Sequence, residues 1–220
     1  MADNMHAVQA RAIAAAVRRK TDGIPLLDDA VCSALLENRS GTCFFTGHRD
    51  ILGHGTRDAD TFRCALRDWL GEQVNWMVYQ GFSTFLCGGA RGFDLLAAAE
   101  VLRIRAAYHP GIRLILLLPC REQTRGWNAR DLALYLAVLE RAEAYYIQSD
   151  YDSDCMFRRN RLMADLSSAG VAYYDRSRER SGTGMTVRYA GKLGIPMVYM
   201  PLSEPETPAD GTGEDTCGHG

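Results

Sequence analysis

Short apolar runs alternate with longer amphipathic stretches along most of this 220-residue chain. The apolar runs have the length of β-strands and lie at residues 42–46, 83–87, 112–119, 144–148, 171–175 and 196–200. They are continuously apolar, which is typical of strands that are covered on both faces. Apolar positions at helical spacing between them indicate helices at residues 62–77, 95–107, 131–141, 155–166 and 185–193. The alternation predicts an α/β fold, a three-layer sandwich in which helices flank a mainly parallel sheet.

The two ends of the chain follow other patterns. Residues 1–40 contain an alanine-rich stretch and a second stretch with apolar residues at helical spacing, separated by Gly23-Ile24-Pro25, and we expect an N-terminal helical extension there. The α/β domain is predicted over residues 41–202. Residues 203–220 are acidic and rich in glycine and proline, and this composition indicates a disordered tail.

Composition narrows the class of protein. An apolar content of 47% is enough for one sizeable core, and a formal charge of -2 gives no basic excess, which disfavours nucleic acid as a partner. Seven cysteines form no CxxC pair, so reduced and mostly buried thiols are expected rather than disulfides or a metal site. Because no signal peptide or membrane span is recognised, a cytoplasmic protein without a membrane partner is predicted. The sequence leaves a homo-oligomeric state open.

Glycines, hydroxyls and arginines gather where the predicted strands end. Residues 46–49 follow the first strand, residues 88–94 the second, and residues 181–184 lie in the loop after the fifth. The carboxyl ends of parallel strands share one edge of a sheet, and ligands bind there at the point where the strand order reverses. We therefore expect a ligand-binding pocket on this edge.

The residue types at this edge favour a phosphate. Glycine-rich turns expose backbone N–H groups, a helix N-terminus adds a positive dipole end, and arginine adds charge-assisted hydrogen bonds. Neither glycine cluster matches GxGxxG or a Walker A loop, so no dinucleotide or other cofactor is predicted. The expected ligand-binding residues are Thr46, Gly47, His48, Arg49, Gly88, Gly89, Ala90, Arg91, Gly92, Asp94, Pro119, Arg159, Asn160, Ser181, Gly182, Thr183 and Thr186.

Each of these features also has a purely structural explanation. The glycine stretch could serve only as a turn, and Asp94 could be a helix cap. His48 could be a loop histidine that is hydrogen-bonded to the backbone. The arginines at 158, 159 and 161 could form the solvated face of a helix. Their collective placement at one edge is what favours a binding site.

Four segments resemble the SLOG superfamily, and within it most closely the YpsA-like family. They are Thr46–Arg49, Gly88–Asp94, Phe157–Met163 and Ser181–Thr183, and the resemblance covers about residues 42–200. The superfamily also includes the DNA-uptake protein DprA/Smf and the LOG phosphoribohydrolases. The resemblance implies a Rossmann-like fold and a nucleotide-type ligand.

The departures from these relatives determine the order in which we rank three possible functions. LOG enzymes carry a glutamate soon after the threonine of their second glycine loop, whereas Gly184-Met185-Thr186-Val187-Arg188 follows here, with no carboxylate. Asp94 or Asp175 would have to replace it. Binding of a nucleotide or nucleotide-derived ligand, with phosphate at the glycine-rich edge, is therefore the leading hypothesis. A nucleoside-monophosphate phosphoribohydrolase is the alternative, and DprA-like binding of single-stranded nucleic acid is the third.

Overall fold

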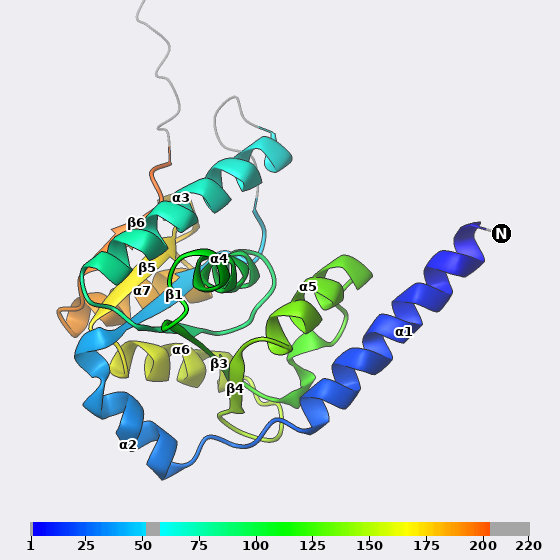
Figure 1. The fold of residues 1–220 in the computed structure, drawn as a ribbon, viewed down its shortest axis with the longest axis horizontal. Coiled ribbons are helices and arrows are strands. Elements are labelled where there is room, and N and C mark those ends of the chain that lie inside the picture. Colours follow the sequence, from blue (N-terminus) through cyan, green and yellow to red (C-terminus); the bar gives the residue numbers. More distant parts are fainter. Residues whose placement is uncertain (1, 52–57, 203–220) are drawn as a thin grey trace, which may run out of the picture.

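The computed structural model describes residues 2–51 and 58–202, so the predicted tail at 203–220 lies outside the described residues. Its centre is a sheet of six parallel strands (Figure 1), with the order β4-β3-β2-β1-β5-β6. The strands are β1 (Thr42–Gly47), β2 (Thr84–Cys87), β3 (Arg113–Leu118), β4 (Glu143–Tyr146), β5 (Ala169–Tyr173) and β6 (Met197–Tyr199). Each predicted apolar run overlaps one of them, and the predicted α/β fold is confirmed.

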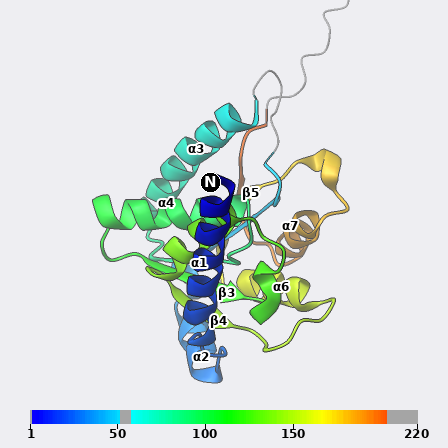
Figure 2. The same ribbon diagram turned by 90° about the vertical axis from the view of Figure 1, so that its right-hand side faces the viewer.

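Helices cover both faces of the sheet, as Figure 2 shows. One core lies under α3 (Ala59–Tyr79), α4 (Phe93–Ala107) and α5 (Ala129–Leu139) and includes Phe45 and Phe85. The other lies under α2 (Asp29–Glu37), α6 (Cys155–Asp165) and α7 (Gly182–Lys192) and includes Phe44 and Leu86. Neighbouring residues of one strand therefore enter opposite cores. This is the reason why the strands are continuously apolar in sequence.

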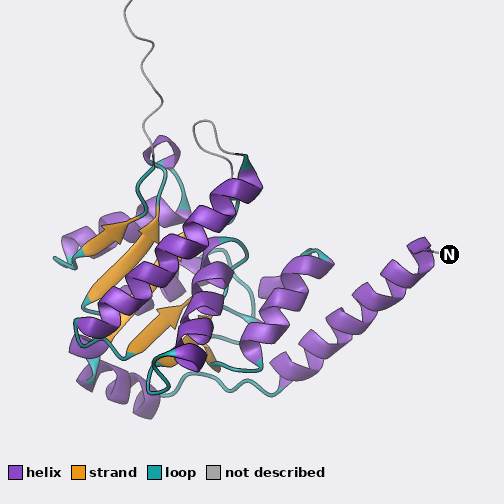
Figure 3. Ribbon diagram, turned by 45° about the horizontal axis from the view of Figure 1, so that its top comes forward, coloured by secondary structure: helices purple, strands orange, loops and turns teal. Residues whose placement is uncertain are grey.

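The order of the strands reverses beside β1. The chain moves outward from β1 through β2 and β3 to β4, and then returns to place β5 on the other side of β1. Every pair of neighbouring strands is parallel (strands are orange in Figure 3), so the loops after β1 and β5 leave one edge in opposite directions. A crevice is expected between two such loops in an open α/β sheet.

The N-terminal segment is attached to the sheet. Helix α1 (Ala2–Asp22) packs against α5 and buries Val17, while its N-terminal end lies away from the sheet (Figure 1). After α1 the backbone pairs with edge strand β4: the N–H of Leu27 donates to the carbonyl of Tyr146 at 2.7 Å, and the N–H of Tyr146 donates to that of Pro25 at 2.9 Å. These bonds cover one edge of the sheet, which would otherwise present unpaired backbone groups.

The cysteines within the described ranges are free thiols. Cys43, Cys87, Cys120 and Cys155 are buried, and Cys217 lies outside those ranges. Burial raises the pKa of Cys43 well above its ordinary value, because the thiolate would lose its hydration. Among the helices that the structure describes, none has the length and apolar character needed to cross a membrane.

Two valines of α1 give a matched test of how this helix is held. Val17 is 4% exposed and Val8 is 61% exposed. Val17→Ala should lower the free energy of unfolding by about 1.5–3 kcal/mol, because it removes buried methyl groups and leaves a cavity. Val8→Ala should stay within about 0.5 kcal/mol of the parent. Urea unfolding of the full chain measures both, and equal effects would contradict the packing of α1 on α5.

Candidate functional site

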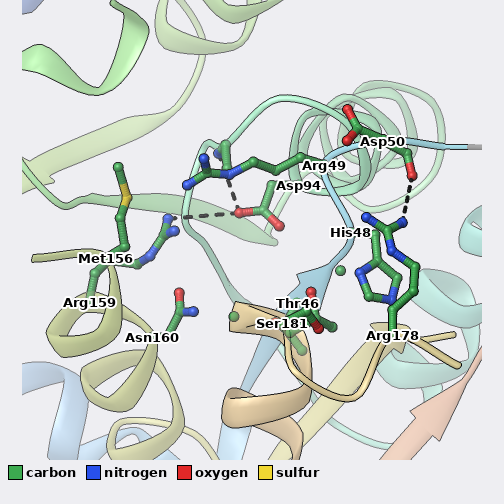
Figure 4. Close-up of a pocket in the computed structure, with 14 residues that line it drawn as sticks. Thr46, His48, Arg49, Asp50, Asp94, Met156, Arg159, Asn160, Arg178 and Ser181 are labelled. Atoms are coloured by element: carbon green, nitrogen blue, oxygen red, sulfur yellow. Dashed lines mark hydrogen bonds and ion pairs between the residues drawn. The ribbon is translucent and has the colours of Figure 1, made fainter. Parts of the chain in front are cut away.

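A cavity of about 380 Å³ opens at the carboxyl edge of the sheet, where the strand order reverses (Figure 4). Segments that follow β1, β2 and β5 line it together with α6. The predicted residues in its lining are Thr46, Gly47, His48, Arg49, Ala90, Asp94, Arg159, Asn160, Ser181, Gly182 and Thr183. These residues come from four separate segments of the sequence, and the fold brings them to one place.

Arg159 is the buried cation of this cavity. It extends from α6, its side chain is 4% exposed, and its Nη1 lies 3.8 Å from Oδ2 of Asp94. Within the described residues, neither Nε nor Nη1 of Arg159 has a hydrogen-bond partner. Burial lowers the pKa of Arg159, because the cation loses hydration, although the charge of Asp94 acts in the opposite direction. A buried guanidinium with unpaired donors is costly, and an anion in the cavity would supply the acceptors that it lacks.

Asp94 partly compensates the positive charge of Arg159. It lies in the first turn of α4, is buried, and accepts a hydrogen bond from the N–H of Ala90 at 3.3 Å. Burial raises the pKa of Asp94, because a carboxylate loses hydration there, and the neighbouring charges of Arg159 and Arg49 oppose that rise. Asp94 therefore acts as a counter-ion below the cavity, and its N–H contact also orders the turn after β2.

Contacts within the protein itself explain why glycines occupy the β2–α4 turn. A Cβ on Gly88 would overlap the guanidinium of Arg159, and a Cβ on Gly92 would overlap the carbonyl of Arg49. Gly92 also has a φ of 82°, a conformation that residues with side chains rarely adopt. Neither these two glycines nor Gly89 lines the cavity. The close approach that this stretch permits is thus made by Arg159 and by the loop after β1.

Arg91, Pro119 and Thr186 also lie outside the lining of the cavity. Arg91 is half-exposed and forms an ion pair with Asp50 at 3.3 Å. Pro119 is buried directly after β3. Thr186 is buried in α7, where its hydroxyl donates to the carbonyl of Gly182 at 2.8 Å. It also accepts a hydrogen bond from Nδ2 of Asn160 at 2.9 Å, which joins α6 to the start of α7.

The N-terminus of α7 faces the cavity. Ser181 caps the helix and its hydroxyl accepts a hydrogen bond from the N–H of Gly184 at 3.1 Å. Among the described residues, the N–H groups of Gly182 and Thr183 have no acceptor. Free N–H groups at the positive end of a helix dipole form an anion site. The phosphate cradle that the sequence suggests at residues 181–183 therefore has suitable geometry.

His48 joins the two sides of the crevice. Its buried ring accepts a hydrogen bond on Nε2 from the N–H of Asp175 at 3.0 Å, so the end of β1 is tied to the end of β5. An accepting Nε2 requires the tautomer protonated on Nδ1. The interpretation of His48 as a histidine bonded to the backbone is confirmed.

The three arginines of α6 point in different directions. Arg158 is exposed and bonded to Gln148 and Asp152, and Arg161 is exposed and packs 4.6 Å above the ring centroid of Tyr189. Only Arg159 is buried. The interpretation of these arginines as one solvated helix face is wrong for Arg159, because the turn after β2 leaves space for its side chain.

Three residues of the lining were not predicted: Asp50, Met156 and Arg178. Arg178 ends the short helix η3 (Arg176–Arg178), and its Nη1 donates to the carbonyl of Asp50 at 3.5 Å. The arginine-rich run after the fifth strand was a signal for it. Within the described ranges, no group of three His, Cys, Asp or Glu side chains could hold a metal ion.

Comparisons with known proteins show the family and agree with the fold. The model of the YpsA family, described as the YspA SLOG family, matches residues 43–193. The chain belongs to this family. Protein YoqJ of Bacillus subtilis, a prophage-derived relative, is 33% identical over 121 residues, which cover 49% of this chain and 69% of YoqJ. A UPF0398 protein of Bacillus pumilus is 23% identical over 140 residues, 61% of this chain and 74% of that protein.

Two solved structures of DNA processing protein A resemble the fold of this family member. The protein from Helicobacter pylori has a TM-score of 0.54 and 18% identity, over 78% of this chain and 69% of the other. The protein from Streptococcus pneumoniae has a TM-score of 0.53 and 16% identity, over 77% of this chain and 52% of the other. The first is described as binding single-stranded DNA. At this identity the likeness shows a shared fold.

Two glycines give a matched test of the site. Gly88→Ala should lower the free energy of unfolding by about 1–3 kcal/mol, because its Cβ would displace the guanidinium of Arg159. Gly182→Ala should change it by less than about 0.5 kcal/mol, because no atom beyond its chain neighbours and the backbone of its own helix lies within 4 Å of the added Cβ. Chemical denaturation measures both variants. Equal stabilities would show that the side chain of Arg159 does not pass over Gly88.

Proposed function

We propose that this protein binds a nucleotide or nucleotide-derived ligand, and that the ligand's phosphate occupies the cavity between the ends of β1 and β5. The observation that carries the proposal is the buried guanidinium of Arg159, which lines the cavity and has two nitrogens without a hydrogen-bond partner among the described residues. A phosphate suits such a group, because its negative charge attracts the guanidinium and its oxygens match the planar arrangement of the N–H donors.

The balance of charge in the lining favours an anion. Three arginines, Arg49, Arg159 and Arg178, face two aspartates, Asp50 and Asp94, which leaves one positive charge. The charge of Arg49 lowers the pKa of Arg159 further, so the two guanidinium groups repel each other. The positive end of α7 adds to this potential. An anion between these groups would relieve the repulsion.

The size of the cavity supports a ligand larger than inorganic phosphate. A volume of about 380 Å³ lies in the range of small-molecule sites. Asn160 also lines the cavity, and its amide donates to Thr186, which leaves its carbonyl oxygen to accept from a sugar hydroxyl. Met156 adds an apolar contact on the same helix. These groups support a phosphate between Arg159 and the N-terminus of α7, with the nucleoside toward Met156 and Asn160.

Nucleic-acid binding has less support. Arg158 and Arg161 are the exposed arginines of α6, and both donate hydrogen bonds to side chains of this protein. The chain carries a formal charge of -2, whereas proteins that follow a phosphate backbone usually present a basic surface. The DNA-binding described for the H. pylori protein therefore does not decide the function here.

Calorimetric titration with AMP, with adenosine as the reference, tests the proposal. AMP should bind and adenosine should bind much more weakly. Arg159→Met, which keeps the length of the side chain and removes its charge, should cost about 1.5–3 kcal/mol of binding free energy. Arg158→Met is the matched control on the same helix and should bind AMP as the parent does. Equal binding of AMP to all three proteins would contradict the proposal.

A second candidate function rests on Asp94. It is a buried carboxylate in the lining of the cavity, and burial raises its pKa, as is found for general acids. Asp175, the other candidate, accepts hydrogen bonds from Ser177 and is not part of the lining. If Asp94 served as an acid near the ribose, the protein could hydrolyse the N-glycosidic bond of a nucleoside monophosphate.

Chromatography of the products separates the two functions. The binding proposal predicts that purine and pyrimidine monophosphates incubated with the protein release no free base. Release of base by the parent protein, together with its loss in Asp94→Asn, would establish hydrolysis instead. A thermal melt of the variant shows whether it is folded.

A further inference from the structure

A second pocket adjoins the phosphate cavity on the other side of the segment that follows β1. Its volume is about 410 Å³, and Arg49 and Asp50 line both pockets. Its walls come from the N-terminal halves of α3, α4 and α5. The segment from Arg49 to Ile51 thus separates two neighbouring cavities at one edge of the sheet.

Four arginines line this second pocket: Arg49, Arg63, Arg91 and Arg130. Its lining contains two carboxylates, Asp50 and Asp131, which leaves two positive charges. Arg63 is paired with Asp60 at 3.2 Å, and Arg91 with Asp50 at 3.3 Å. Among the described residues, Arg49 and Arg130 form no ion pair.

The position of Arg130 is electrostatically unfavourable within the protein. It lies in the first turn of α5, where the positive end of the helix dipole repels a cation. The acid of that turn is Asp131, and its side chain instead accepts a hydrogen bond from Nδ2 of Asn128 at 2.9 Å. Ile51, Leu95, Leu96 and Leu134 form the apolar part of the pocket, and Arg130 lies exposed beside them. An anion in this pocket would remove the conflict.

We propose that the ligand carries a second anionic group, which binds in the pocket of Arg49, Arg63, Arg91 and Arg130. The inference rests on the proposed phosphate site, because Arg49 joins the two pockets. The ligand class is then a nucleotide with more than one phosphate or another extended anion, rather than a monophosphate. The first phosphate binds at Arg159 and α7, and the anionic chain continues past Arg49 toward Arg130.

Titration of the protein with the series AMP, ADP and ATP, in EDTA to exclude divalent metal, tests this inference. Affinity should rise with the number of phosphates. Arg130→Ala should weaken ATP binding roughly 10-fold or more, the usual effect of losing a charge-assisted contact, and should leave AMP binding within about twofold. Arg19→Ala on α1 removes the same charge far from both pockets and should leave all three affinities unchanged. The variants are exposed arginines, so thermal melts should coincide with that of the parent.

The outcomes separate the inference from the proposed function. Equal affinity for AMP and ATP, or an Arg130→Ala variant that binds ATP as the parent does, overturns the second anion site and leaves the phosphate site in place. If none of the three nucleotides binds, the phosphate site itself is overturned. Displacement of ATP by a 20-residue oligothymidylate, with an affinity that falls steeply with salt, would assign the arginines to nucleic acid and also overturn the inference.

Discussion

The side chain of Arg159 crosses the carboxyl edge of the sheet inside the protein, between Gly88 and Asp94, and the site is organised around this buried charge. Position 88 must lack a side chain because the guanidinium lies where a Cβ would be. Position 94 supplies the nearest negative charge. A buried ion pair is seldom the most stable solution for a protein, because desolvation offsets most of the attraction. Its presence beside a cavity is one of the observations that support the proposed ligand.

Other contacts hold the surrounding segments in place. His48 ties the end of β1 to the end of β5, and Asn160 ties α6 to α7 through Thr186. Gln123 donates to the carbonyl of Gly89 at 2.7 Å and fixes the turn after β2 from the side of η2 (Arg121–Thr124). The groups that face the cavity are therefore held by bonds between neighbouring elements of the fold. A site that is ordered before binding loses less conformational entropy when the ligand enters.

The fold was readable from sequence because each strand has both faces buried. Phe44 and Phe45 enter opposite cores, and such pairs make the strands continuously apolar and distinct from the helices between them. The place of the site followed from the parallel order of the strands. The direction of single side chains did not follow, since Arg158, Arg159 and Arg161 are chemically alike and only the tertiary structure decides which is buried. The sequence predicts Gly88 and Gly92 as ligand contacts, whereas the groups that lie against them in the structure come from Arg159 and Arg49, which are distant in sequence.

A crystal structure of the protein grown with AMP tests the central claim most directly, because the claim concerns the partner of one side chain. The account predicts a phosphate oxygen within about 3.2 Å of a nitrogen of Arg159. It also predicts that the same phosphate accepts from the N–H groups of Gly182 and Thr183, with Asp94 still paired to Arg159. A phosphate bound elsewhere, with Arg159 in contact only with protein atoms or water, would contradict the account.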